Sequence, residues 1–195
     1  MNDPLAKSRK INAQPIVGQR AKEIQAFGTL TRYSIGLAEQ TRASSVEALN
    51  LLLADTISLR DLYKKHHWQV SGPTFYPLHL LFDKHAHEQT ELIDELAERV
   101  QILGGVAIAM GQDVAQLTRI EHPPRGREEV PVQVSRLLEA HQHILIEARN
   151  LAGVAAEMRD EGTSDLAVSR IVRVNEAQVW FISEHLVDGP LVRAE

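Results

Sequence analysis

The sequence predicts an all-α protein folded as a four-helix bundle, in which a long crossover carrying a short helix joins the second helix to the third. Apolar residues recur at helical spacing in four long segments, and no segment shows the strict apolar–polar alternation of a strand. Gly and Pro separate these segments. The 195 residues, 44% of them hydrophobic, suffice for one domain with a sizeable core.

Residues 1–42 are expected to form a partly flexible N-terminal arm, because prolines and glycines interrupt any helical period there. Seven Lys and Arg oppose three Asp and Glu in residues 1–43, a net charge of +4. The remaining residues carry 14 basic and 23 acidic groups, a net charge of −9. A basic arm on an acidic body is typical of a tail that seeks phosphate or another anionic surface. The bundle domain is predicted at 43–190.

The first long helix is predicted to start at Ser44, because Ser44 and Glu47 fit a capping box, and to end near residue 70 before Gly72-Pro73. The second is predicted over about 74–103 and ends at Gly104-Gly105. The crossover then carries a short helix near 113–118.

The third long helix is predicted over about 130–159 and the fourth over about 163–187, with Gly189-Pro190 as its stop. Four long amphipathic helices with one long crossover form the ferritin-like type of bundle.

Composition limits the kinds of site that the chain can carry. The absence of cysteine excludes disulfides, thiolate zinc sites and iron–sulfur clusters, so His, Asp and Glu must hold any metal. No apolar run approaches the roughly 20 residues that span a bilayer, and no apolar stretch follows the basic N-terminal residues. We therefore expect a cytoplasmic protein with no membrane contact.

Metal-compatible residues gather on one face of the predicted second helix. His79 and Asp83 are four residues apart, as are Asp94 and Glu98, so each pair stacks on the helix surface. His67 lies at the end of the first helix, just before the turn. A solvated helix face is the alternative interpretation, but such a face usually also carries Lys or Arg partners.

The spacing of the two pairs bears on assembly. Asp83 and Asp94 are eleven residues apart, which is about 16 Å along an α-helix. Ligands of one metal ion lie within about 2–2.5 Å of it, so the two pairs cannot share a site within one chain. Two antiparallel copies of the helix related by a twofold axis would bring one pair opposite the other.

These residues resemble the pattern of the Dps family, the DNA-binding proteins from starved cells, which are miniature ferritins. The resemblance is densest over residues 59–105. The matching positions are His67-Trp68, Gly72, His79-x3-Asp83, Asp94-x3-Glu98-Arg99 and Leu103-Gly104-Gly105.

The resemblance implies a hollow homododecamer with a ferroxidase centre at each twofold interface. It implies that His67, His79 and Asp83 come from one chain, and Asp94 and Glu98 from its partner. Fe(II) would be oxidised there, preferentially by hydrogen peroxide or else by dioxygen, and stored as a ferric mineral, which protects DNA; zinc is a competing ion. Association with the nucleoid through non-specific DNA binding by the arm, with a vestigial metal site, is the alternative function. A helical scaffold whose cluster is structural or holds zinc is a third.

Typical ferritins instead hold their irons inside one bundle with Glu-x-x-His motifs, and the residues three positions before His67 and His79 are Lys64 and Tyr76. That absence argues against ferritin and bacterioferritin proper.

Further residues are open to two interpretations. Trp68 is an aromatic side chain at the site or in an interface, and His87 is an extra ligand or an exposed or interfacial residue. His66 and His85 are expected at the surface, and His141 in the core with a hydrogen-bond partner. The acidic turn of Asp160, Glu161 and Asp165 either caps a helix or, by the resemblance, lines a pore that admits iron.

Overall fold

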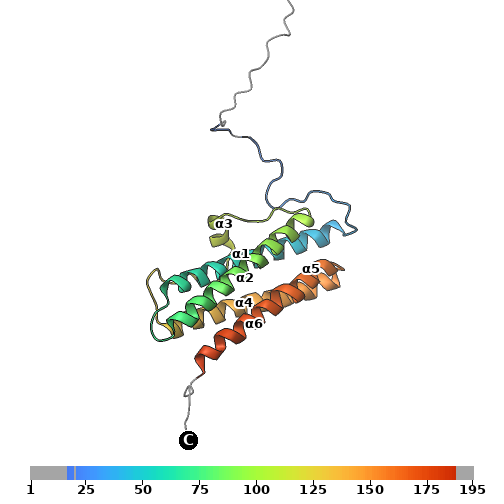
Figure 1. Cartoon of the computed structure of the whole chain (residues 1–195). Coiled ribbons are helices and arrows are strands. Elements are labelled where there is room, and N and C mark those ends of the chain that lie inside the picture. Colours follow the sequence, from blue (N-terminus) through green and yellow to red (C-terminus); the bar gives the residue numbers. More distant parts are fainter. Residues whose placement is uncertain (1–16, 20, 188–195) are drawn as a thin grey trace, which may run out of the picture.

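The computed structural model describes residues 17–19 and 21–187, and every regular element in these ranges is helical. Figure 1 shows two layers, one made by α1 (Glu39–Gln69) and α2 (Phe75–Ile102), the other by α4 (Val130–Glu157) and the last helical rod. The crossover carries the short α3 (Gly111–Leu117). The predicted four-helix bundle with a short helix in its crossover is confirmed.

The last rod is continuous but not uniformly α-helical. It runs through α5 (Glu161–Asp165), the π-helical η1 (Leu166–Val172), α6 (Arg173–Ser183) and the 3-10 turn η2 (Glu184–Leu186). Its start lies two residues before the predicted one, because Asp160 accepts a hydrogen bond from the backbone N–H of Thr163 and so caps α5. The predicted stop at Gly189-Pro190 lies outside the described residues.

The first helix begins at Glu39 and not at Ser44, so the predicted capping box is wrong. Tertiary contacts explain the extra turn. Arg42 is buried, and its Nη1 donates to the carbonyl oxygens of Thr31 (2.9 Å) and Leu103 (3.0 Å), which holds the first turn of α1 against the end of α2.

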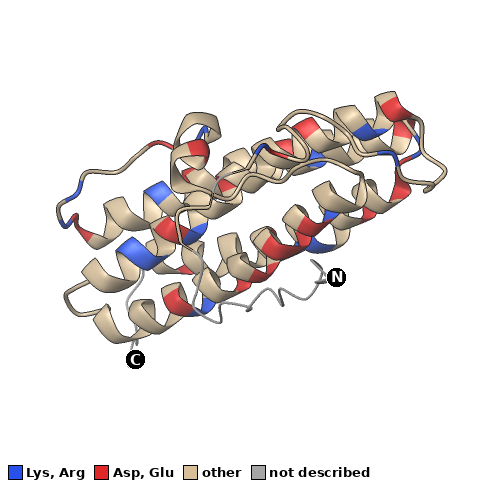
Figure 2. Ribbon diagram, turned by 90° about the horizontal axis from the view of Figure 1, so that it is seen from above, with Lys and Arg blue, Asp and Glu red and all other residues tan. Residues whose placement is uncertain are grey.

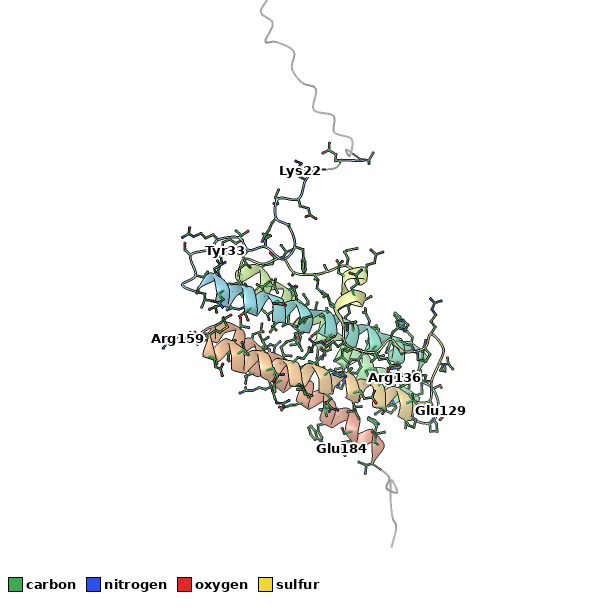
Figure 3. All side chains as sticks on the ribbon, turned by 180° about the vertical axis from the view of Figure 1, so that it is seen from behind. Lys22, Tyr33, Glu129, Arg136, Arg159 and Glu184 are labelled. Atoms are coloured by element: carbon green, nitrogen blue, oxygen red, sulfur yellow. The ribbon has the colours of Figure 1, made fainter. Side chains whose placement is uncertain are left out.

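The core lies between the two layers and is mainly aliphatic, as the side chains filling this space in Figure 3 show. Burying one such side chain contributes roughly 1.5–3 kcal/mol. Most charged residues of the helices are exposed or half-buried, and Figure 2 marks their positions along the ribbon. No helix among the described residues is long and apolar enough to cross a bilayer. Fully buried side chains include Leu49, Leu53, Leu78, Leu92, Leu96, Leu137 and Ile144.

A buried carboxylate fastens the two layers together at one end of the bundle. Asp160 accepts hydrogen bonds from Ser45 Oγ of α1 (2.7 Å) and from Arg99 Nη2 of α2 (2.5 Å). Burial acts to raise the pKa of Asp160, but these bonds and those from Thr163 outweigh burial and lower it. Asp160 is therefore a capping and bridging residue and does not line a pore. For the exposed Glu161 and Asp165 the pore stays a prediction.

The segment before α1 docks on the end of α2 through Gly104. The Gly104 carbonyl oxygen accepts from Thr31 N (2.7 Å) and from Gln25 Nε2 (2.9 Å). Gly104 has φ +87°, and a Cβ there would meet the Thr31 carbonyl oxygen at 2.3 Å. Gly104 thus ends α2, as predicted, and also admits the neighbouring backbone. Figure 3 shows Tyr33 near the start of α1 and Lys22 farther out on this segment.

We predict that Gly104→Ala destabilises the protein by about 2 kcal/mol or more, because the substitution adds left-handed strain to a steric overlap with backbone. Chemical denaturation measures the change. Gly126→Ala is the matched control, since Gly126 has no atom within 4 Å of its Cβ position and no positive φ. Equal stability of the two variants would contradict this account of Gly104.

A second buried carboxylate, Asp55 of α1, bonds to the crossover and interacts with the half-buried Glu147 of α4. Asp55 Oδ1 accepts from Thr118 Oγ1 and from the backbone N–H of Arg119, both at 2.7 Å. No donor in the described part of the chain reaches Asp55 Oδ2 or Glu147 Oε2. Burial, then the hydrogen bond and charge of Asp55, raise the pKa of Glu147 to about 7 despite Arg119. Glu147 therefore holds a proton up to about neutral pH.

This pair predicts a pH dependence of stability. Between about pH 4.5 and 7 the folded Glu147 holds a proton that the unfolded chain has lost, so its contribution to stability falls as pH rises through this window. Denaturant titrations at several pH values, compared between parent and Glu147→Gln, isolate the effect because the other titrating groups are common to both. A difference between the two proteins that does not change from pH 5 to pH 8 would refute the raised pKa of Glu147.

Candidate metal centre

Two histidines face each other where α1 ends and α2 begins. Their rings stack with centroids 3.8 Å apart. His67 Nδ1 lies 2.8 Å from the carbonyl oxygen of His79, and His79 Nδ1 lies 2.9 Å from the carbonyl oxygen of His67. A carbonyl oxygen only accepts, so each Nδ1 carries a proton, and the neutral form of each imidazole has its lone pair on Nε2. The reciprocal bonds thus fix the tautomer that a metal-binding imidazole needs.

A carboxylate lies beside this histidine pair. Asp83 follows His79 by one helical turn, and its Oδ1 is 3.9 Å from His67 Nε2. Lys64 Nζ donates to the same oxygen at 2.6 Å. That hydrogen bond is the main cause of the lowered pKa of Asp83, whose side chain is 55% exposed. His67, His79 and Asp83 therefore lie close together, with the carboxylate bonded to Lys64. We call this group the histidine half-site, and metal binding by it stays a prediction.

The other two predicted ligands lie further along α2. Asp94 and Glu98 are both exposed, and the eleven residues from Asp83 to Asp94 correspond to about 16 Å of helix. Within residues 17–19 and 21–187 no group of three or more His, Asp or Glu side chains is assembled as for a metal ion. One chain thus presents the five residues as two separated groups on the surface.

Exposed apolar side chains surround the histidine half-site. Trp68 is 71% exposed, Tyr76 69%, Leu80 50% and Phe75 44%. The Phe75 ring lies 5.2 Å from the His79 ring, and the Lys64 ammonium lies 5.7 Å from the Trp68 ring. Contiguous exposed apolar groups mark an interaction surface. The half-site therefore lies within a surface suited to contact with another protein chain.

Two expectations about the other histidines are wrong. His66 and His85 were expected at the surface, yet both are fully buried, and burial lowers the pKa of each to about 4. His141 is buried and hydrogen-bonded, as predicted. His87 is exposed, and its Nε2 lies 3.8 Å from Glu91 Oε1. A role for His87 as a ligand stays a prediction.

Sequence reasoning also missed the Lys64–Asp83 contact. Lys64 precedes His67 by three residues, so it lies on the same helix face as the half-site. This spacing could have placed Lys64 near the half-site. It could not identify Asp83 as the partner, because Asp83 lies on the next helix, beyond the turn.

Comparisons with known proteins agree with this architecture. The family model for the ferritin-like domain matches residues 46–192. DpsC from Streptomyces coelicolor superposes with a TM-score of 0.87 at 55% identity, covering 88% of this chain and all of that one. A Nostoc nutrient stress-induced DNA-binding protein is 33% identical over 86% of this chain and 91% of its own length. The Halobacterium salinarum DNA protection during starvation protein is 30% identical over 75% and 80%. A Vibrio cholerae Dps, described as a member of the ferritin-like diiron-carboxylate superfamily, has a TM-score of 0.75 at 27% identity, covering 84% and 99%.

We predict that Lys64→Met strengthens Fe(II) binding by a factor of about 1.4 to 5. In the parent, Asp83 must give up an ion pair worth about 0.2–1 kcal/mol before it can bind the metal, and in the variant it need not. Anaerobic calorimetric titration measures the affinity. Lys84→Met is the control, since Lys84 also lies on α2 but pairs with Glu88. Weaker binding in Lys64→Met than in the control would show that Lys64 assists the site.

Proposed function

The chain belongs to the Dps family of ferritin-like proteins, and from that premise we propose that it sequesters iron by oxidising Fe(II) at sites shared between two chains. The observation that carries the proposal is the reciprocal His67–His79 pair, which leaves both Nε2 lone pairs free beside Asp83. The second group, Asp94 and Glu98, is exposed on the same helix and supplies the remaining carboxylates from a partner.

The donor set suits iron as a substrate. Carboxylates bind Fe(II) and retain Fe(III), while neutral imidazoles add affinity without adding charge. Asp83 lies next to the histidines, so we assign these three residues to one iron position, with Asp94 and Glu98 of the partner chain completing and bridging it. Zinc, which accepts the same ligands but has no redox chemistry, would compete as an inhibitor.

Hydrogen peroxide is the proposed oxidant. Two Fe(II) ions supply the two electrons that peroxide needs, and with two protons from solvent the products are two Fe(III) ions and two waters. No hydroxyl radical is released when both electrons arrive together. Dioxygen is the slower alternative oxidant. We further propose that the ferric product is stored as mineral inside a hollow homododecamer, in which every chain is paired with a twofold partner.

We predict that Fe(II) loaded without oxygen and then treated with peroxide is oxidised at about two irons per peroxide. Asp94→Asn/Glu98→Gln should lower the initial rate more than tenfold, because it removes two anionic ligands at each shared site. Glu91→Gln, an exposed glutamate on α2, is the control and should keep the parent rate. Mineralisation by the double variant at the parent rate would refute the assigned site, and a monomeric particle mass would refute the cage.

DNA binding is a second candidate function, favoured by the basic arm and by the names of two relatives, the Nostoc nutrient stress-induced DNA-binding protein and the Halobacterium DNA protection during starvation protein. We propose that the arm contacts the phosphate backbone without sequence preference. The bundle itself is acidic, so DNA binding depends on the arm.

We predict that deleting residues 1–16, which contain Lys7, Arg9 and Lys10, weakens DNA binding and reduces the dependence of the affinity on salt. Gel-shift titrations at several salt concentrations measure both. Replacing the three basic residues by Gln in the full-length chain separates charge from length. An unchanged affinity in both proteins would exclude a role for residues 1–16 in DNA binding.

A further inference from the structure

A buried polar network crosses the centre of the bundle and takes no part in the proposed site. Its members come from all four long helices and are at most 1% exposed. Of its members, the sequence singled out only His141, expected in the core, and His85, expected at the surface. A polar cluster in an otherwise aliphatic core costs free energy unless its groups are hydrogen-bonded. The hydrogen bonds of this network therefore indicate which groups donate and which accept. The members are Tyr63 of α1, His85 and Gln89 of α2, His141 of α4, and Asn175 and Gln178 of α6.

The hydrogen bonds determine where each proton of the central groups lies. Asn175 Nδ2 donates to the carbonyl oxygen of Ile171 (2.7 Å), so Asn175 Oδ1 is the acceptor that faces His141 Nδ1 at 2.8 Å. His141 therefore carries its proton on Nδ1 and has a lone pair on Nε2. The Tyr63 hydroxyl lies 2.5 Å from that Nε2 and donates to it.

On its other side, the phenol oxygen of Tyr63 faces a hydrogen-bond donor. His85 Nδ1 lies 3.1 Å from Tyr63 Oη. Since the Tyr63 proton points to His141, His85 donates to the phenol oxygen. Tyr63 is therefore held between a base that can take its proton and a donor that stabilises the oxygen left behind.

Such a phenol can lose an electron only together with its proton. Burial, followed by the charge of Glu88, raises the pKa of Tyr63 well above its ordinary value of 10, so the phenolate is not available for oxidation. The lone pair of His141 removes this obstacle, because the proton moves along an existing hydrogen bond as the electron leaves. Neither of the other two tyrosines is built into such a pair, since Tyr33 is 49% and Tyr76 69% exposed.

The network adjoins the histidine half-site. Tyr63 precedes His67 by one turn of α1, about 6 Å of rise. Its ring lies 6.0 Å from that of Phe82, the residue next to Asp83. An iron held by His67, His79 and Asp83 is therefore separated from the phenol by one helical turn and one aromatic ring.

We propose that Tyr63 is a reserve one-electron donor that completes the reduction of peroxide when only one Fe(II) occupies the site. The inference rests on the proposed function. A single Fe(II) supplies one electron, and one-electron cleavage of hydrogen peroxide would release a hydroxyl radical. With Tyr63, the iron and the phenol each give one electron. Fe(II), tyrosine, hydrogen peroxide and two solvent protons yield Fe(III), a neutral tyrosyl radical and two waters, while the phenol proton moves along the hydrogen bond and is held on His141.

The same surroundings return the radical to tyrosine. A later Fe(II) gives the electron and His141 returns the proton, so the sum of both steps is two Fe(II), one peroxide and two solvent protons giving two Fe(III) and two waters. Burial lowers the pKa of His141 to about 3, so a proton held there returns readily to the phenol. The tyrosine thus acts repeatedly and is not consumed.

The test uses the full-length assembled protein loaded with Fe(II) at less than one ion per site, mixed with peroxide and frozen within milliseconds. Electron paramagnetic resonance should show a tyrosyl radical in the parent and in Tyr33→Phe and Tyr76→Phe, and none in Tyr63→Phe. Spin trapping should detect severalfold more hydroxyl radical from Tyr63→Phe. At two irons per site, its iron-to-peroxide ratio should equal that of the parent.

A second variant keeps the test valid if Tyr63→Phe does not fold. His141→Gln keeps an acceptor near the phenol but no base, so the tyrosyl signal should be lost while Tyr63 remains. A radical that persists in Tyr63→Phe, or one carried by Trp68, would overturn the inference. So would equal hydroxyl-radical yields from parent and variant. A parent that does not oxidise iron with peroxide at all would instead overturn the proposed function.

Discussion

The rigidity of α2 is the constraint on which the account depends. An α-helix rises 1.5 Å per residue, so eleven residues hold Asp83 and Asp94 about 16 Å apart whatever their side chains do. The five predicted ligands therefore cannot meet within one chain. Under the proposed function, iron oxidation therefore depends on chain association, because a ligand set that is incomplete in one chain can be completed only at an interface with another.

The bundle supplies the remaining geometry. Its two layers are tied at one end by Asp160, which joins α1, α2 and the start of α5, and at the other the α1–α2 turn brings His67 against His79. The segment that follows α2 packs closely against α1 at Gly105, where a Cβ would meet the Val46 side chain at 2.6 Å. A shift of either helix would separate the two imidazoles, so the packing of these helices and the orientation of the half-site are coupled.

Periodicity was sufficient to predict the helices and the crossover, because apolar stripes and glycine stops are local signals. Periodicity did not predict the burial of polar residues or the start of a helix where these depend on a residue far away in the sequence. His85 and Gln89 lie on the buried stripe of α2 with Phe82 and Leu92, but their partners lie on other helices. A polar residue with such a partner cannot be told from a solvated one by sequence alone. The early start of α1 has the same origin, since Arg42 is held by Thr31 and Leu103.

The most direct test of the intersubunit site is complementation between two inactive chains. One chain carries His79→Ala/Asp83→Ala and the other Asp94→Ala/Glu98→Ala, and the two are co-assembled in equal amounts. A site shared across a twofold axis is intact once in every mixed pair, so the mixture should regain about one quarter of the parent iron-oxidation rate while each variant alone stays inactive. A mixture as inactive as its components, although mixed pairs are present by mass spectrometry, would contradict the shared site.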